Sequence, residues 1–394
     1  MDTFHKTLLV CWFGVFTTSM GLSQLAPILP LYIRSLGVSE YDEIASYSGL
    51  CFGITSLLMA VFSPLWGALS SRFGCKIMLL RASFGMAVLT FALAFVQNVE
   101  QIIIIRALTG VVSGFISTAV MFVAIISPKA KAAQALATIS TASVSGNLIG
   151  PLFGGLFSEF MGIRALFVLI AVLLLCSFLT TYFFIHEKKG DIKARQIYEQ
   201  GFERNFTLII ALFVLTFIIQ AGFTAVIPIM TLFVEQIHHS NAYIALWTGL
   251  VVAASGISNL LFASKIGKIA DKVGVSKVLV LALCFSGIVF YLQALAQDIF
   301  TLIVLRLLLG VGLGGLMPCI NALFKKNVST AKLGLVFGLN QSFYALGNFF
   351  GSVGGGVLTG KFGISLVFSF TCCAFLLSAL GFWLTQRFHA VKKA

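Results

Sequence analysis

The sequence predicts an all-α membrane protein with twelve transmembrane helices arranged as two pseudo-symmetric six-helix bundles. Three observations support this prediction. The chain is 59% hydrophobic and 10% charged, with a mean hydropathy of +1.03. It contains twelve long apolar runs, and its two halves repeat one another at an offset of 200 or 201 residues. A soluble protein carries about 25% charged residues, so lipid must solvate most of this chain.

Each apolar run is long enough to cross a bilayer as a helix. Residues 8–33, for example, carry no charge, and a helical span needs about 20 such residues. Membrane barrels are excluded because their strands are short and alternate in polarity. The expected spans are 7–33, 44–69, 78–98, 101–126, 133–158, 165–185, 206–234, 243–264, 278–297, 299–324, 333–360 and 363–386.

The net charge of +13 follows the membrane topology. With both termini in the cytoplasm, 21 of the 26 Lys and Arg residues, Arg81 among them, fall in cytoplasmic segments. Three fall outside, and the remaining two, Arg106 and Arg306, fall within spans. This bias obeys the positive-inside rule. The basic residues therefore face anionic lipid headgroups, and no nucleic-acid partner is expected.

The repeat divides the chain into two bundles and a linker. We predict an N-terminal bundle over 1–185, a cytoplasmic linker over 186–204 and a C-terminal bundle over 205–394. Six spans bring the chain back to its starting side, so the repeat is parallel, with its axis along the membrane normal. The eight cysteines show no metal-binding spacing, and neither a metal nor another cofactor is expected.

A basic turn joins the second span to the third and recurs between the eighth and ninth. Its glycines suit the left-handed conformation that ends a helix. The turn is either a hinge and charged latch between the halves or simply a tight basic turn, and its presence in both halves favours the latch. The candidate gating residues are Gly67, Arg72, Gly74 and Lys76 in the first copy and Gly267, Asp271 and Gly274 in the second.

The fifth span carries small residues at regular spacing, namely Gly146, Gly150, Pro151, Gly154 and Gly155. Glycines four residues apart form a face that lets helices approach closely. The proline removes one backbone hydrogen bond and can bend the helix. The eleventh span repeats the glycines. We predict a gating interface here, with ordinary helix packing as the alternative.

Arg106 and Arg306 are the most unusual residues within spans. An arginine inside the membrane is costly and indicates function by default, although a side chain near a span end can also reach water. No carboxylate or histidine lies in the middle of a span, so no catalytic cluster is visible and an enzyme is not expected. The candidate residues for proton coupling are Arg106, Glu235 and Glu159.

Uncharged polar and aromatic residues within the spans suggest a substrate cavity. Small-molecule sites are mostly apolar and contain a few polar anchors, although many such polar groups only join helices. The predicted cavity residues are Gln24, Gln220, Phe16, Phe223, Asn340, Gln341, Tyr344 and Arg306.

Three segments together resemble the drug:proton antiporters of the major facilitator superfamily. Residues 67–76 resemble the family's loop motif, 106–114 its fourth-span motif and 146–155 its antiporter motif. Residues 62–67 and 77–82 resemble the bacterial multidrug exporter group of MdtG and PmrA. One departure is Ser71, where the family motif has aspartate; Asp271 keeps that aspartate in the second half.

The resemblance implies a secondary exporter of small amphipathic compounds in the bacterial inner membrane. It implies alternating access and proton coupling, with Arg106 matching the family's relay arginine. The expected partners are a small-molecule substrate, protons and membrane lipid, and the expected state is a monomer. The alternative is a dedicated exporter of an anionic metabolite such as a siderophore, which the two in-span arginines favour.

Overall fold

The computed structural model describes residues 3–127, 132–187, 206–238, 243–328 and 333–391. Every regular element in these ranges is an α-helix. The predicted linker lies outside the described residues except for His186 and Glu187. Nine helical stretches of the described chain are long and apolar enough to cross a membrane.

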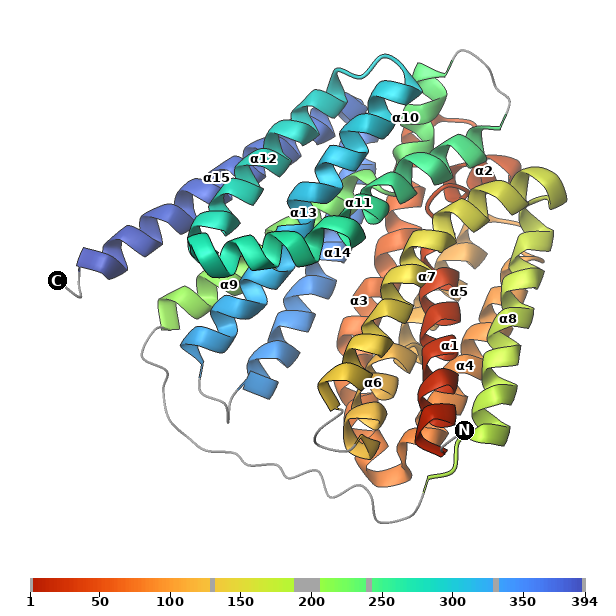
Figure 1. Cartoon of the computed structure of the whole chain (residues 1–394). Helices are drawn as coiled ribbons and strands as arrows, with labels where there is room; N and C mark the ends of the chain where they lie inside the picture. The colour runs from red at the N-terminus through yellow and green to blue at the C-terminus, as the bar shows by residue number, and fades with distance from the viewer. Residues whose placement is uncertain (1–2, 128–131, 188–205, 239–242, 329–332, 392–394) are drawn as a thin grey trace. The chain divides into compact units, whose positions relative to one another are not determined.

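The helices follow the predicted spans in order (Figure 1). The first half forms α1 (Thr3–Ser23), α2 (Leu29–Ser35), α3 (Tyr41–Phe73), α4 (Cys75–Leu93), α5 (Val99–Val112), α6 (Phe115–Ile126), α7 (Ala132–Met161) and α8 (Ile163–Phe184). The second half forms α9 (Phe206–Val226), α10 (Met230–Ile237), α11 (Ile244–Val273), α12 (Val275–Ala294), α13 (Ile299–Asn327), α14 (Leu333–Phe362) and α15 (Ile364–Val391).

Three of the predicted continuous spans are split into two helices. The first and seventh spans are interrupted at Pro27 and Pro228, where proline lacks the N–H that a helix needs. The fourth span is interrupted at Ser113 and Gly114 without a proline. Its counterpart α13 is a single helix. The sequence of the fourth span did not reveal this break because no proline or charged residue lies at Ser113 and Gly114.

The described helices group into two compact units. The first takes in the described residues of 1–39, 54–195 and 242–250, and the second those of 40–53, 196–241 and 251–394. Helices α3 and α11 therefore each contribute their beginning to one unit and their remainder to the other.

The same helix pairs recur in both units. In the first unit α1 packs against α7 and α8, and α4 packs against α8 (Figure 1). In the second unit α9 packs against α14 and α15, and α12 packs against α15. The repeat seen in the sequence is therefore a repeat of helix packing, as expected for two like-built bundles.

Each unit has an apolar core, and large apolar side chains also cover its outer faces. In the first unit Cys11, Leu79, Phe115 and Ile139 belong to one cluster that joins α1, α4, α6 and α7. On the outside, Phe95 is 63% exposed. Such exposure suits contact with lipid rather than water.

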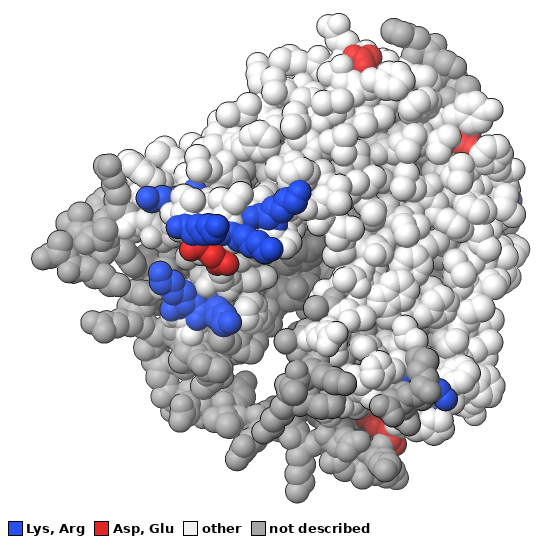
Figure 2. Space-filling view, viewed as in Figure 1, with Lys and Arg blue, Asp and Glu red and all other residues white. Residues whose placement is uncertain are grey.

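Charged side chains gather in few places on the face shown in Figure 2, most of which is uncharged. Basic side chains gather around an acidic patch in the region of the turn between α11 and α12. The sequence there contains Lys265, Lys268, Lys272, Lys277 and Asp271.

Candidate functional site

The glycine face of α7 packs directly against the backbone of α1. A Cβ on Gly146 would lie 2.5 Å from the carbonyl oxygen of Phe16, and one on Gly154 would lie 2.4 Å from that of Gln24. Gly150 lies between them against the same helix. Only glycine permits this approach, because real Cβ atoms do not come so close to backbone atoms.

The other side of α7 contacts the beginning of α11 within the first unit. A Cβ on Gly155 would lie 2.2 Å from the Ala245 carbonyl oxygen, and one on Gly249 would lie 2.4 Å from that of Pro151. Glu159 is exposed, and its Oε1 accepts a 2.9 Å hydrogen bond from the Ala245 backbone N–H. This carboxylate lies at the N-terminus of α11, where the helix dipole favours negative charge.

The second half repeats this arrangement around α14. Gly347, Gly351 and Gly355 lie against the backbone of α9, and Gly356 lies against the carbonyl oxygen of Ala45 at the beginning of α3. The predicted small-residue faces therefore permit close helix contacts in both units. Their part in gating stays a prediction.

Arg106 and Arg306 are both buried, at 4% and 1% exposure. The backbone around Arg106 is held by α3, since Thr55 Oγ1 donates to the Arg106 carbonyl oxygen at 2.9 Å. The Nη2 of Arg306 lies 3.5 Å from Met230 Sδ at the start of α10. Among the described residues the Arg306 Nε has no hydrogen-bond partner. Neither arginine is therefore an exposed side chain at a span end.

Arg81, which the charge pattern assigned to the cytoplasmic side, lies six residues into α4 and is half-buried. Helix α4 begins at Cys75, directly after Gly74, so Arg81 is part of a helix rather than of a loop. Its cytoplasmic placement stays a prediction.

The first copy of the basic turn is tied to the end of α8. Gly74 has a φ of 97° and separates α3 from α4. Glu187 accepts hydrogen bonds from the backbone N–H groups of Cys75 at 2.9 Å and Lys76 at 2.8 Å. The Lys76 ammonium donates to the Tyr182 carbonyl oxygen at 2.9 Å. A carboxylate therefore satisfies the N-terminal N–H groups of α4.

Sequence reasoning did not single out Glu187, because the capped residue Cys75 is 112 positions away. The only signal was that it is the first acid after an apolar span. The side chains of Ser71 and Arg72 and the surroundings of Gly67 lie outside the described part.

The second copy of the turn lies open. Gly274 has a φ of 112°, and apart from its own local backbone no described atom lies within 4 Å of where its Cβ would be. A Cβ on Gly267 would likewise meet no described atom outside its own helix backbone, and Asp271 is exposed. In the register that aligns Gly162 with Gly363, the position equivalent to Glu187 is Phe388, and α15 continues past it.

The predicted cavity residues are distributed over both units. Gln24 is fully buried in the first unit, and neither of its amide atoms has a hydrogen-bond partner within the described chain. Phe16, also in the first unit, stacks on Trp12 with ring centroids 5.4 Å apart. Gln220 Nε2 donates to Asn348 Oδ1 at 3.0 Å in the second unit, where Phe223, Asn340, Gln341, Tyr344 and Arg306 also lie.

Gln24 therefore remains the best candidate for an anchor of this set, because Gln220 already joins two helices. Of the others, Gln341 is exposed and Asn340 is buried. Glu235, predicted for proton coupling, lies in the last turn of α10 and is half-buried.

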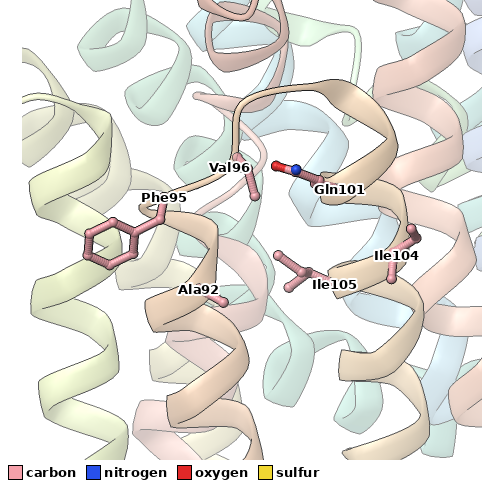
Figure 3. A pocket seen from close by; sticks show the side chains of 6 residues that line it. All are labelled: Ala92, Phe95, Val96, Gln101, Ile104 and Ile105. Carbon is pink, nitrogen blue, oxygen red and sulfur yellow. The ribbon is translucent and has the colours of Figure 1, made fainter.

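A small cavity of about 170 Å³ lies between the end of α4 and the start of α5 (Figure 3). It contains none of the predicted residues. Phe95 and Ile104 in its wall are 63% and 58% exposed, so this hollow opens on the outer apolar surface. Its lining consists of Ala92, Phe95, Val96, Gln101, Ile104 and Ile105. No described group of His, Cys, Asp or Glu could hold a metal ion.

Comparison with known proteins identifies the family. The profile of the Major Facilitator Superfamily matches residues 11–211 and again residues 212–393. The chain is a member of the Major Facilitator Superfamily. The resemblance drawn from the three sequence motifs is therefore confirmed, and with it the all-helical two-bundle fold.

Relatives and solved structures of this superfamily match nearly the whole chain. Proteins named multidrug resistance protein MdtG from Salmonella dublin and Salmonella schwarzengrund are 37% identical over 97% of this chain and 96% of their own length. The D-xylose–proton symporter superposes with a TM-score of 0.79 at 16% identity, over 97% of this chain and 98% of the other.

A bacterial homologue of the human lysosomal transporter Spinster also has a TM-score of 0.79, at 13% identity and 98% coverage of both chains. The likeness to these two structures establishes the fold. Because the superfamily consists of transporters, this chain is a multi-pass membrane transporter for small molecules rather than a member of an enzyme family.

Proposed function

We propose that this transporter exports small amphipathic compounds, as a multidrug efflux protein driven by protons moving inward. The observation that carries the proposal is the 37% identity, along 97% of the chain, to proteins named as multidrug resistance proteins. Identity spread over the whole length includes both bundles, so it supports a shared transport activity rather than a shared fold alone.

Alternating access is the proposed mechanism, with the two sequence halves, 1–185 and 205–394, as the moving bodies. The contacts of Gly155 and Pro151 with the beginning of α11 support this division, because they join segments from different halves through small residues. Such contacts can separate and re-form without displacing bulky side chains. The residues of the two basic turns are proposed as the second set of gating elements.

Proton coupling is assigned to Arg106, Glu159 and Glu235. Every described carboxylate lies in a loop or in the first or last turn of a helix: Glu40, Asp42, Glu43, Glu100, Glu159, Glu187, Glu235, Asp271 and Asp298. Protonation of Glu159 removes the charge that holds the Ala245 N–H at the start of α11. That loss links proton binding to a contact between segments from different halves.

The bias of Lys and Arg supports a topology with both termini in the cytoplasm. We place the protein in the bacterial inner membrane as a monomer, with a small-molecule substrate, protons and lipid as its partners.

The test is transport by purified protein in proteoliposomes with an imposed pH gradient. A lipophilic cationic dye should accumulate against its gradient only when protons can flow the other way, and a protonophore should abolish this accumulation. Dye movement that ignores the pH gradient would indicate a passive pathway. Protein-free liposomes provide the background.

Export of an anionic metabolite such as a siderophore is the second candidate. It is favoured by the in-span arginines Arg106 and Arg306, together with the lack of a mid-span carboxylate in the described ranges. The same proteoliposomes loaded with a ferric chelate distinguish the two substrate classes. Coupled movement of the chelate but not of the dyes would favour this candidate.

A further inference from the structure

The fourth span is broken between α5 and α6, and the break leaves backbone carbonyl oxygens without their usual helical donors. Helix α5 ends at Val112 and α6 begins at Phe115, with Gly114 at a φ of 123°. In a continuous helix the carbonyl oxygens of Val111 and Ser113 would accept from the N–H groups four residues later. The break removes those donors, and an unsatisfied carbonyl in the membrane interior costs several kcal/mol.

Two side chains from other helices supply the missing donors. The Trp66 indole N–H of α3 donates to the Val111 carbonyl oxygen at 2.6 Å. The Arg81 Nη2 of α4 donates to the Ser113 carbonyl oxygen at 3.1 Å. All these residues belong to the first compact unit. The break is therefore held open by side-chain donors rather than by proline.

The two donors also contact each other, so they act together. The Arg81 guanidinium carbon lies 3.6 Å from the centre of the Trp66 ring, a cation–π arrangement. A Cβ on Gly114 would lie 3.5 Å from Arg81 Nη2 and 4.0 Å from Trp66 Cδ1. We call Trp66, Arg81, Ser113 and Gly114 the clamp.

Burying the Arg81 guanidinium to satisfy one carbonyl oxygen carries a high free-energy cost. A guanidinium has five N–H donors. In the described chain its Nε and Nη1 are buried without a hydrogen-bond partner. A neutral donor would satisfy Ser113 at lower cost, because burying a charge is favourable only when its donors are well paired. The cation is therefore explained poorly by stability alone.

The described residues of the second half show no such arrangement. At the equivalent positions it carries Ile266 and Leu281, and α13 runs unbroken from Ile299 to Asn327. The clamp belongs to the span that carries Arg106, which lies seven residues before Ser113, about two helical turns. The position of Arg106 relative to α6 is therefore set by the joint that the clamp holds.

We propose that Trp66 and Arg81 are positioning residues for transport, which fix the joint between α5 and α6 and so the segment that bears Arg106. This role rests on the proposed transport function. Loss of the clamp should lower the maximal transport rate about tenfold and leave the KM for substrate within about twofold, because neither side chain is assigned to the substrate cavity.

The test compares Arg81→Met, Arg81→Lys and Trp66→Phe in proteoliposomes. Arg81→Lys retains a cation and a donor and should recover at least a third of the rate that Arg81→Met loses. Trp66→Phe retains the ring but not the N–H and should show an intermediate loss. Leu281→Met, at the equivalent exposed position of the second half, is the matched control and should transport normally.

Hydrogen exchange provides a readout that does not depend on transport. In Arg81→Met, amides of residues 113–118 should exchange at least fivefold faster, while those of 313–318 stay unchanged. A wild-type rate together with unchanged exchange in Arg81→Met overturns the proposal, as does a raised KM with an unchanged maximal rate. If the wild-type protein moves no tested compound, the transport assignment fails, and the exchange comparison still decides the clamp.

Discussion

The fourth span, in the first half, and the tenth span, in the second half, begin alike and then diverge. Each starts with a side-chain cap, because Asn98 and Asp298 accept from backbone N–H groups three residues later. Each buries an arginine, Arg106 or Arg306, at the same register. The first then breaks after Val112 whereas the second continues. A duplicated sequence can thus retain its helix packing while only one copy acquires a joint.

The turns that precede the third and ninth spans also differ, and again the additional contact is in the first half. In the first half Glu187 caps α4, and in the second half the equivalent position is Phe388, which offers no carboxylate. The first half therefore carries both the broken span and the capped turn. We infer that the first half is the more constrained at these two places, while the equivalent span of the second half stays continuous.

The largest effect should come from replacing the two buried arginines, Arg106 and Arg306, one at a time. Arg106→Ala should lower the maximal transport rate more than tenfold, because this residue is proposed to couple transport to protons. Arg306→Ala should mainly raise KM, because it is proposed to line the cavity. Initial rates over a range of substrate concentrations, normalised to protein in the liposomes, measure both. Identical kinetic defects in the two variants would remove this distinction between the halves.

Next in size is the joint itself. Gly114→Ala should destabilise the protein by about 1–3 kcal/mol, because a φ of 123° strains any residue with a Cβ. Gly314→Ala should cost less, because Gly314 lies in a regular helix, where alanine is favoured. Its Cβ would lie 3.2 Å from the Ala263 backbone nitrogen and 3.3 Å from the Asn259 carbonyl oxygen, so α11 must shift by a few tenths of an ångström. Denaturation midpoints in detergent compare them, and equal losses would mean that the break imposes no special backbone requirement.

A smaller effect is expected at the capped turn. Glu187→Gln should cost about 0.5–1 kcal/mol, because it removes the negative charge from the N-terminus of α4. Asp271→Asn, in the exposed second copy of the turn, should change stability by less than about 0.5 kcal/mol. Thermal unfolding measures both variants. Faster hydrogen exchange limited to the first turn of α4 should accompany only the first of them.

The smallest effect concerns the caps of the two spans. The hydroxyl and backbone N–H of Thr301 lower the pKa of Asp298 below its usual value. The ionised cap therefore adds stability above about pH 4 and loses it as pH falls through the lowered pKa. Asn98 does not titrate, so its cap should be insensitive to pH. Hydrogen exchange at the first turns of α13 and α5 between pH 3 and 7 should show this contrast; parallel profiles would contradict it.

Much of the fold could be predicted because the membrane imposes it. The apolar runs predicted the helices, although the breaks of the first and seventh spans at Pro27 and Pro228 were not predicted. The glycines of α7 also packed where their four-residue spacing suggested. The break at Ser113 and Gly114 escaped prediction because glycine is common in membrane helices and only donors from other helices make the break tolerable. The contacts of Arg81 also escaped prediction because they join α4 to a break in another helix.

The sequence by itself determined that lipid surrounds the chain, that its two halves repeat and that it belongs to its superfamily. Hydropathy, a repeat at an offset of 200 or 201 residues and short motifs depend only on the order of the residues. Only the tertiary structure decided which side chains serve a remote backbone. Trp66, Arg81 and Glu187 lie 32 to 112 positions from the groups they contact. Hydrogen bonds require the right distance and direction in space, and those are fixed only once the helices have packed.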